Sequence, residues 1–86
     1  MAQGLLHEVD HLRDELQEFY HVLRRGEGDV AGAVARLRAA ISRAEPMIVV
    51  PPDQVVTMAL EQRWGYLQLV SLLQSARVEV ERCSRN

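Results

Sequence analysis

The stretch from Pro52 to Cys83, PDQVVTMALEQRWGYLQLVSLLQSARVEVERC, decides how this chain folds. It is long enough to form a single helix over residues 52–83, about 45 Å long. On a helical wheel its polar residues fall on one narrow line, and its apolar residues form two seams. One seam comprises Val55, Met58, Ala59, Tyr66, Leu69, Leu73, Ala76 and Val80, and the other Val56, Leu60, Trp64, Leu67 and Val78. Because a surface helix needs only one apolar stripe, two seams predict neighbours on both sides.

Length, composition and charge indicate one small folded domain. The chain has 86 residues, of which 48% are hydrophobic and 26% charged, a balance that disordered tails lack. A domain of this size buries about 60% of its unfolded surface, so self-association is a common source of additional stability. The net charge of −2 argues against a general nucleic-acid binder, which needs a basic surface.

Other features of the sequence favour an intracellular location. Cys83 is the only cysteine, which excludes an internal disulfide and fits a reducing compartment. No apolar run approaches the roughly 18 residues of a membrane span, and the N-terminal segment lacks the features of a signal peptide. We therefore expect a cytoplasmic or nuclear protein that binds neither a membrane nor nucleic acid.

Two shorter helices are predicted before the long stretch. A helix over about 3–25 follows from apolar residues at heptad spacings of 4 and 3, namely Leu5, Val9, Leu12, Leu16, Phe19 and Leu23. Gly26 is expected just beyond its end, and Asp29 is expected to cap a second helix over about 30–44. This second helix repeats the spacing with Val30, Val34, Leu37, Ile41 and Ala44. The short turn between the two predicts antiparallel neighbours.

Residues 45–51, EPMIVVP, are the one irregular segment. Pro46 ends the second helix, since the residue before a proline avoids the α region. We predict an extended connector that buries Met47, Ile48 and Val50 over the end of the helices. The alternative is that Ile48–Val50 adds a strand to the sheet edge of a partner.

These elements predict an all-α fold with a single domain over residues 1–86. The expected architecture is an antiparallel three-helix bundle, or helical hairpin, with coiled-coil-like heptad packing and a long C-terminal helix. Gly65 lies in the middle of that long helix. It either permits a close approach of two backbones or is tolerated at an exposed site.

The segment His7–His11, with the sequence HEVDH, matches the zinc-binding motif H-E-x-x-H. On a helix, two histidines four residues apart can bind zinc, and the glutamate between them can act as a general base. The metzincin continuation requires a glycine and a third histidine at positions where this chain has Asp14 and Gln17. Val9 lies on the heptad seam, which turns His7 and His11 outward and favours a solvated polar face.

The sequence shows no catalytic constellation, and we expect no cofactor. The preferred interpretation is a non-catalytic protein–protein interaction module, an oligomerisation, adaptor or scaffold subunit. It would form a homodimer or a complex with another helical subunit. The alternatives are a small metal-binding regulator that uses His7, His11 and Asp14, and, more remotely, a metallohydrolase.

The partner-binding surface is predicted on the long helix. The two shorter helices together cannot cover both of its seams, and we expect its second half to stay open. The expected partner-binding residues are Trp64, Tyr66, Leu69, Leu73, Ala76 and Val80.

Overall fold

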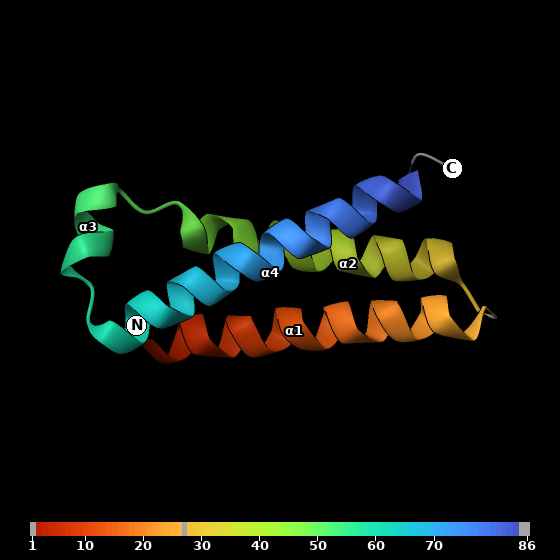
Figure 1. The fold of residues 1–86 in the computed structure, drawn as a ribbon, viewed down its shortest axis with the longest axis horizontal. Helices are drawn as coiled ribbons and strands as arrows, with labels where there is room; N and C mark the ends of the chain where they lie inside the picture. Colours follow the sequence, from red (N-terminus) through yellow and green to blue (C-terminus); the bar gives the residue numbers. More distant parts are fainter. Residues whose placement is uncertain (1, 27, 85–86) are drawn as a thin grey trace.

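The computed structural model describes residues 2–26 and 28–84, and this part of the chain is helical without any strand (Figure 1). The α-helices are α1 (Ala2–Arg25), α2 (Val30–Ala44), α3 (Pro52–Thr57) and α4 (Leu60–Ser84). A short 3₁₀ helix, η1 (Glu45–Ile48), follows α2 directly. The predicted all-α fold class is therefore confirmed, and the bounds of α1 and α2 agree with the sequence prediction within one residue.

Helices α1, α2 and α4 lie side by side in an elongated assembly of 45 × 22 × 16 Å. Figure 1 shows α1 and α4 running in the same direction and α2 running in the opposite direction beside them. Each of the three contacts the other two, and η1 contacts both α2 and α4. The core consists of the apolar residues that these helices turn toward one another: Leu5, Val9, Leu12, Leu16, Phe19, Leu37, Ala40, Ile41, Ala44, Leu69, Leu73 and Ala76.

The turn between α1 and α2 is built as the sequence predicts. Gly26 has a φ of +64° and Gly28 a φ of +117°, in the region that side chains with a Cβ rarely adopt. Asp29 caps α2, because its Oδ1 accepts a 2.8 Å hydrogen bond from the Gly32 amide. These two local devices reverse the chain and begin α2 at Val30.

The single helix predicted over 52–83 is wrong, since the chain leaves helical geometry at Met58 and Ala59 between α3 and α4. Met58 is extended, with φ −62° and ψ 144°. At the break, Arg63 Nη2 donates to the carbonyl oxygens of Val56 and Met58 and holds the non-helical backbone. The connector also differs from the prediction. We expected residues 45–51 to be extended, but residues 45–48 form η1, which rises only about 2 Å per residue instead of about 3.3 Å.

The apolar part of this connector divides between the core and the surface. Met47 and Ile48 pack against the core, as predicted, and Val50 is partly buried. Val49 is 80% exposed. The hydroxyl of Tyr66 lies 3.5 Å from the carbonyl oxygen of Ile48, so η1 is held at the level of Tyr66 on α4.

Arginine ion pairs join the helices around the core. Arg36 of α2 pairs with Glu15 of α1 at 3.2 Å, and Arg77 of α4 pairs with Glu45 of η1 at 2.6 Å. Pairs that are this exposed contribute at most about 1 kcal/mol each, so packing of the apolar seams dominates the stability.

Candidate interaction surface

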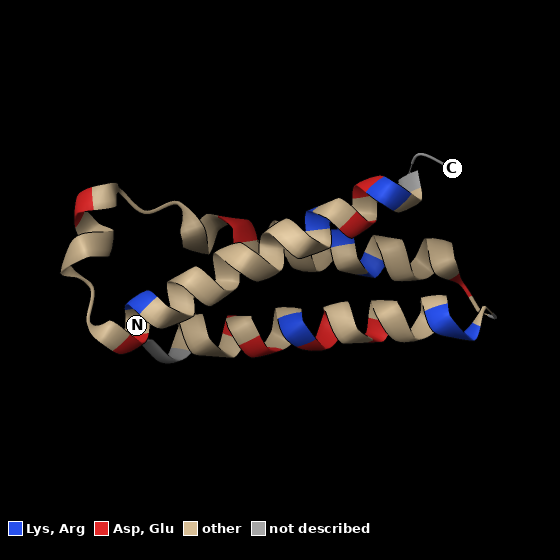
Figure 2. Ribbon diagram, viewed as in Figure 1, with Lys and Arg blue, Asp and Glu red and all other residues tan. Residues whose placement is uncertain are grey.

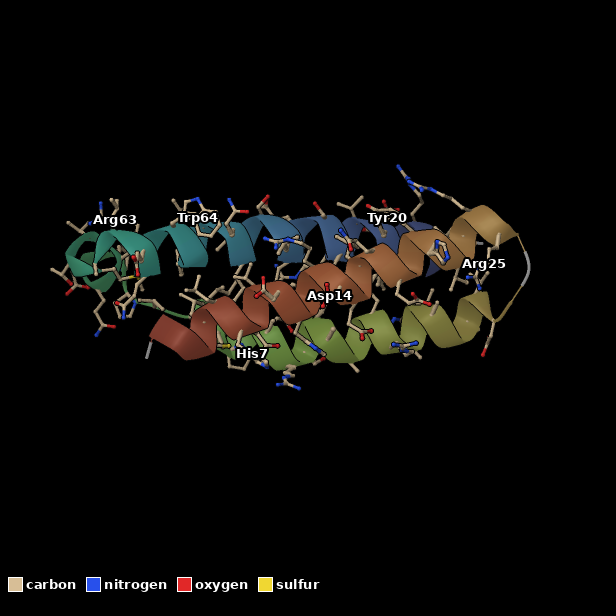
Figure 3. The ribbon with its side chains drawn as sticks, turned by 90° about the horizontal axis from the view of Figure 1, so that it is seen from below. His7, Asp14, Tyr20, Arg25, Arg63 and Trp64 are labelled. Carbon is tan, nitrogen blue, oxygen red and sulfur yellow. The ribbon has the colours of Figure 1, made fainter. Side chains whose placement is uncertain are left out.

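Large apolar side chains are exposed on both α3 and α4: Val56 on α3, and Leu60, Trp64, Leu67 and Val78 on α4. We call Val56, Leu60, Trp64 and Leu67 the outer face. The exposed fractions are 71% for Val56, 78% for Leu60, 53% for Trp64 and 55% for Leu67. Leu60, Trp64 and Leu67 follow one another at heptad spacings of 4 and 3, so they form a stripe along one side of α4. Figure 3 shows Trp64 on the edge of α4 that is remote from α2.

The outer face is hollowed beside Trp64. An open hollow of about 510 Å³ is lined by Leu6 of α1 together with Leu60, Glu61 and Trp64 of α4. Its lining is almost entirely apolar, and the one charged residue is Glu61. Leu6 reaches the hollow because α1 and α4 approach closely at Gly65. A Cβ at this glycine would lie 3.2 Å from Leu6 Cδ2, which decides the open question about Gly65 in favour of a close approach.

The region around the outer face is poor in charge. The whole chain has 10 basic and 12 acidic residues. Within residues 46–76, the only charged residues are Asp53, Glu61 and Arg63. Figure 2 shows the result as a long tan run through the middle of α4, while charges lie in the first turn of α4, at its far end and along α1. A surface that keeps apolar side chains exposed and charges away is typical of a binding site.

Arg63 holds the break between α3 and α4 in place. Its Nη2 donates to the carbonyl oxygens of Val56 at 2.6 Å and Met58 at 3.3 Å. These carbonyls lie at the end of α3, where no helical partner is left and a cation suits the helix dipole. Arg63 thereby links the start of α4 to the end of α3, which carries the exposed Val56.

The structure corrects most of the predicted partner-binding residues. Leu69, Leu73 and Ala76 have 0% exposure, and they belong to the chain's own core. Tyr66 and Val80 are partly buried and pack against that core. Trp64 alone is exposed.

The reason for this correction is the position of α2 along α4. Because η1 turns at the level of Tyr66, α2 runs along the second half of α4. Its 15 residues, about 22 Å, are long enough to cover the roughly 17 Å from Leu69 to Val80. The second seam is the one that stays exposed, at Leu60, Trp64 and Leu67 and again at Val78. The sequence analysis identified that seam but expected a neighbour to cover it.

The predicted metal candidates do not converge. His7 and Asp14 are exposed and His11 is partly buried. Figure 3 shows His7 and Asp14 at separate turns of α1. Within residues 2–26 and 28–84, no group of three or more His, Cys, Asp or Glu side chains could hold a metal ion.

The glutamate of the H-E-x-x-H match serves a different purpose. Glu8 is 4% exposed, and its Oε2 pairs with Nε of Arg43 at 3.2 Å between α1 and α2. Its Oε1 is buried without a hydrogen-bond partner. The sequence analysis missed this burial, although Glu8 directly precedes Val9 on the seam.

Tyr20 and Glu79 tie α1 to the far end of α4. The Tyr20 hydroxyl donates a 2.8 Å hydrogen bond to Glu79 Oε2, and Arg82 approaches the other Glu79 oxygen at 3.4 Å. The hydrogen bond to Glu79, followed by burial and the negative charge of Glu79, raises the pKa of Tyr20. This network lies at the opposite end of α4 from the outer face.

Two further results concern membrane-spanning helices and similarity to known proteins. None of the helices in the described residues has the length and apolar character needed to cross a membrane. No protein-family model, no curated protein and no solved structure matches this chain.

Proposed function

We propose that this chain is a non-catalytic protein–protein interaction module that binds its partner through the outer face. The single observation that carries the proposal is the run of exposed apolar residues from Val56 to Leu67. Leaving four large apolar side chains in water forgoes about 1.5–3 kcal/mol for each one that a partner would bury. A continuous patch of this kind normally marks a contact surface in a folded protein.

The rest of the molecule supports this role as a rigid base. In our proposal α1, α2 and α4 form a three-helix bundle with coiled-coil-like packing. The heptad residues of α1 from Leu5 to Phe19 are buried, as are Leu37, Ile41 and Ala44 of α2. The core therefore fixes the rotation of α4 about its own axis, and the outer face is presented without a folding cost at the moment of binding.

The chemistry of the surface favours an apolar helical partner. The stripe Leu60–Trp64–Leu67 has the spacing with which one helix packs into the groove of another. Trp64 is of a residue type enriched among the side chains that dominate binding energies. Since only Glu61 carries charge in the hollow, the partner surface is expected to be apolar with a hydrogen-bond donor near Glu61.

Site-specific photo-crosslinking in the native cell tests the proposal. A photoreactive amino acid at Leu67 is expected to form an adduct with a protein. The matched control carries it at Ala39, an exposed residue of α2 outside the outer face, and is expected to form none. Equal labelling at both positions, or none at Leu67, would contradict the proposal.

A further inference from the structure

We infer that the outer face binds a second copy of this chain, with the two α4 helices antiparallel about a two-fold axis that passes beside Trp64. This inference rests on the proposed function and names the partner. Three properties of the outer face carry it: its symmetry in sequence, its hollow, and its area and charge.

The first property is the symmetry of the stripe. In an antiparallel helix pair related by a two-fold axis, facing residues have numbers with a constant sum, because each step forward on one helix is a step back on the other. With the axis beside Trp64, this tryptophan faces its own copy, and Leu60 lies one residue, or about 1.5 Å, from the level of Leu67 of the other chain. The three outer-face residues of α4 therefore each lie near an apolar residue of the other chain.

Other positions of the axis match less well. An axis near Ser71 would set Trp64 against Val78 but Leu60 against Arg82. Leu67 would face the polar Ser75, and both leucines would lose an apolar partner. The distribution of apolar residues therefore favours the register centred on Trp64.

The second property is that a protruding side chain, Trp64, lies next to the hollow. The indole of Trp64 is 53% exposed, and the hollow beside it is lined by Leu6, Leu60 and Glu61. A two-fold contact requires such self-complementarity, since the same patch serves both partners. Each indole can enter the hollow of the other copy, where Glu61 offers an acceptor for its N–H group. A buried tryptophan needs an acceptor of this kind.

The third property concerns area and charge. The exposed parts of the four outer-face side chains amount to on the order of 500 Å² per copy, or 1,000 Å² for the pair, which is the lower limit for a specific interface. The two Glu61 carboxylates would lie about 9 Å apart along the helix axis, close to a Debye length, so their repulsion is largely screened. No charged residue lies between Trp64 and Ala76 to oppose the approach.

The experiment uses Trp64 as a built-in reporter, because it is the only tryptophan of the chain. We expect light scattering to show a dimer whose population rises with concentration. The Trp64 emission is expected to shift to the blue over the same concentration range, as the indole leaves water.

Two aspartate substitutions supply the matched comparison. Leu67 and Val78 are both 55% exposed on α4, but only Leu67 lies within the paired segment. Leu67→Asp is expected to weaken dimerisation by on the order of 100-fold, because an unpaired carboxylate would be buried between the chains. Val78→Asp is expected to leave it unchanged. A dimer that survives Leu67→Asp, or that responds equally to both changes, overturns the inference.

Disulfide pairing tests the antiparallel register. In a Cys83→Ser background, a mixture of Leu60→Cys and Leu67→Cys chains is expected to oxidise to a mixed dimer. A mixture of Leu67→Cys and Val78→Cys chains is expected to form no disulfide-linked dimer under the same conditions, and the opposite pattern would overturn the register.

The remaining outcomes separate this inference from the proposed function. A monomer at the highest concentration, with the emission of a water-exposed indole, shows that the second copy is wrong while the outer face remains open to another partner. A monomer with the emission of a buried indole, and no binding of an apolar dye, shows that the chain covers this face itself. Both proposals then fail.

Discussion

The hydroxyl of Tyr20 on α1 donates a 2.8 Å hydrogen bond to Glu79 on α4, across 59 positions of sequence. The contact raises the pKa of Tyr20 above its ordinary value of 10.0, because the hydrogen bond, then burial and then the carboxylate charge favour the neutral phenol. The folded chain therefore holds this proton more tightly than the unfolded chain. The resulting stabilisation is fully present below about pH 10 and is lost as the pH rises through the folded pKa.

Tyr20→Phe should lower the free energy of unfolding at neutral pH by about 1–2 kcal/mol, because Glu79 loses its donor from α1. Because phenylalanine has no ionisable hydroxyl, the variant should also lose less stability above pH 10 than the parent protein does. Urea unfolding at a series of pH values measures both effects. Glu79→Gln keeps an acceptor but removes the charge, so it should weaken the alkaline loss while retaining part of the stability. An alkaline profile unchanged by either substitution would contradict this assignment.

The Glu8–Arg43 pair should respond asymmetrically to substitution. Arg43→Met leaves the buried Glu8 carboxylate unpaired and should cost about 1–2 kcal/mol, a value reduced by the 58% exposure of the Arg43 side chain. Glu8→Met removes the buried charge together with its unpartnered oxygen and should be neutral or stabilising. The double variant should match Glu8→Met in chemical unfolding. A large loss in Glu8→Met would show that the carboxylate has a favourable role beyond this pair.

Gly65 should be sensitive to the size of the side chain placed there. Gly65→Ala gains about 1 kcal/mol of helix propensity but presses on Leu6 and Leu5 at 3.2 and 3.4 Å, so its net change should be small. Gly65→Val should destabilise by about 1–3 kcal/mol, because the added methyl groups separate α1 from α4. Gly4→Ala is the control, since no atom lies within 4 Å of the added Cβ. Thermal unfolding of the three variants tests the order, and a stable Gly65→Val protein would refute it.

Arg63 should control the local order of α3 more than the stability of the whole chain. Arg63→Met removes the donors to Val56 and Met58, and α3 itself contains no fully buried residue. Hydrogen exchange in residues 52–59 should accelerate by on the order of 10-fold, while the core amides change little. Arg24→Met, at an exposed position in the last turn of α1, should leave exchange in this segment unaltered. Unchanged exchange in the Arg63 variant would show that α3 is held by other contacts.

The histidine face of α1 should not contribute to the fold. Changing both His7 and His11 to Ala should alter the free energy of unfolding by less than about 0.5 kcal/mol, as is usual for surface positions. Zinc titration of the parent should show no stoichiometric site of micromolar affinity. A site that appears in the parent and disappears in the double variant would support the metal-binding alternative instead.

Much of the local structure could be predicted from the residues alone. Heptad spacing located α1 and α2 within one residue of their ends, and Asp29 and Gly26 marked the turn between them. The same spacing identified the two apolar seams of the C-terminal stretch, including the outer face. Such features depend on neighbours within one or two helical turns, and the sequence records those neighbours directly.

Whether each apolar seam is buried or exposed depends on the path of the whole chain. The compact turn of η1 set α2 along the second half of α4, which buried Leu73 and left Trp64 exposed. Hydrogen bonds from Arg63 hold the break at Met58, and the crossing of α1 over α4 placed Gly65 at a close contact. The sequence by itself determined which faces are apolar, because periodicity is a local property. Only the tertiary structure decided which of those faces the chain covers, because that depends on distances between segments far apart in sequence.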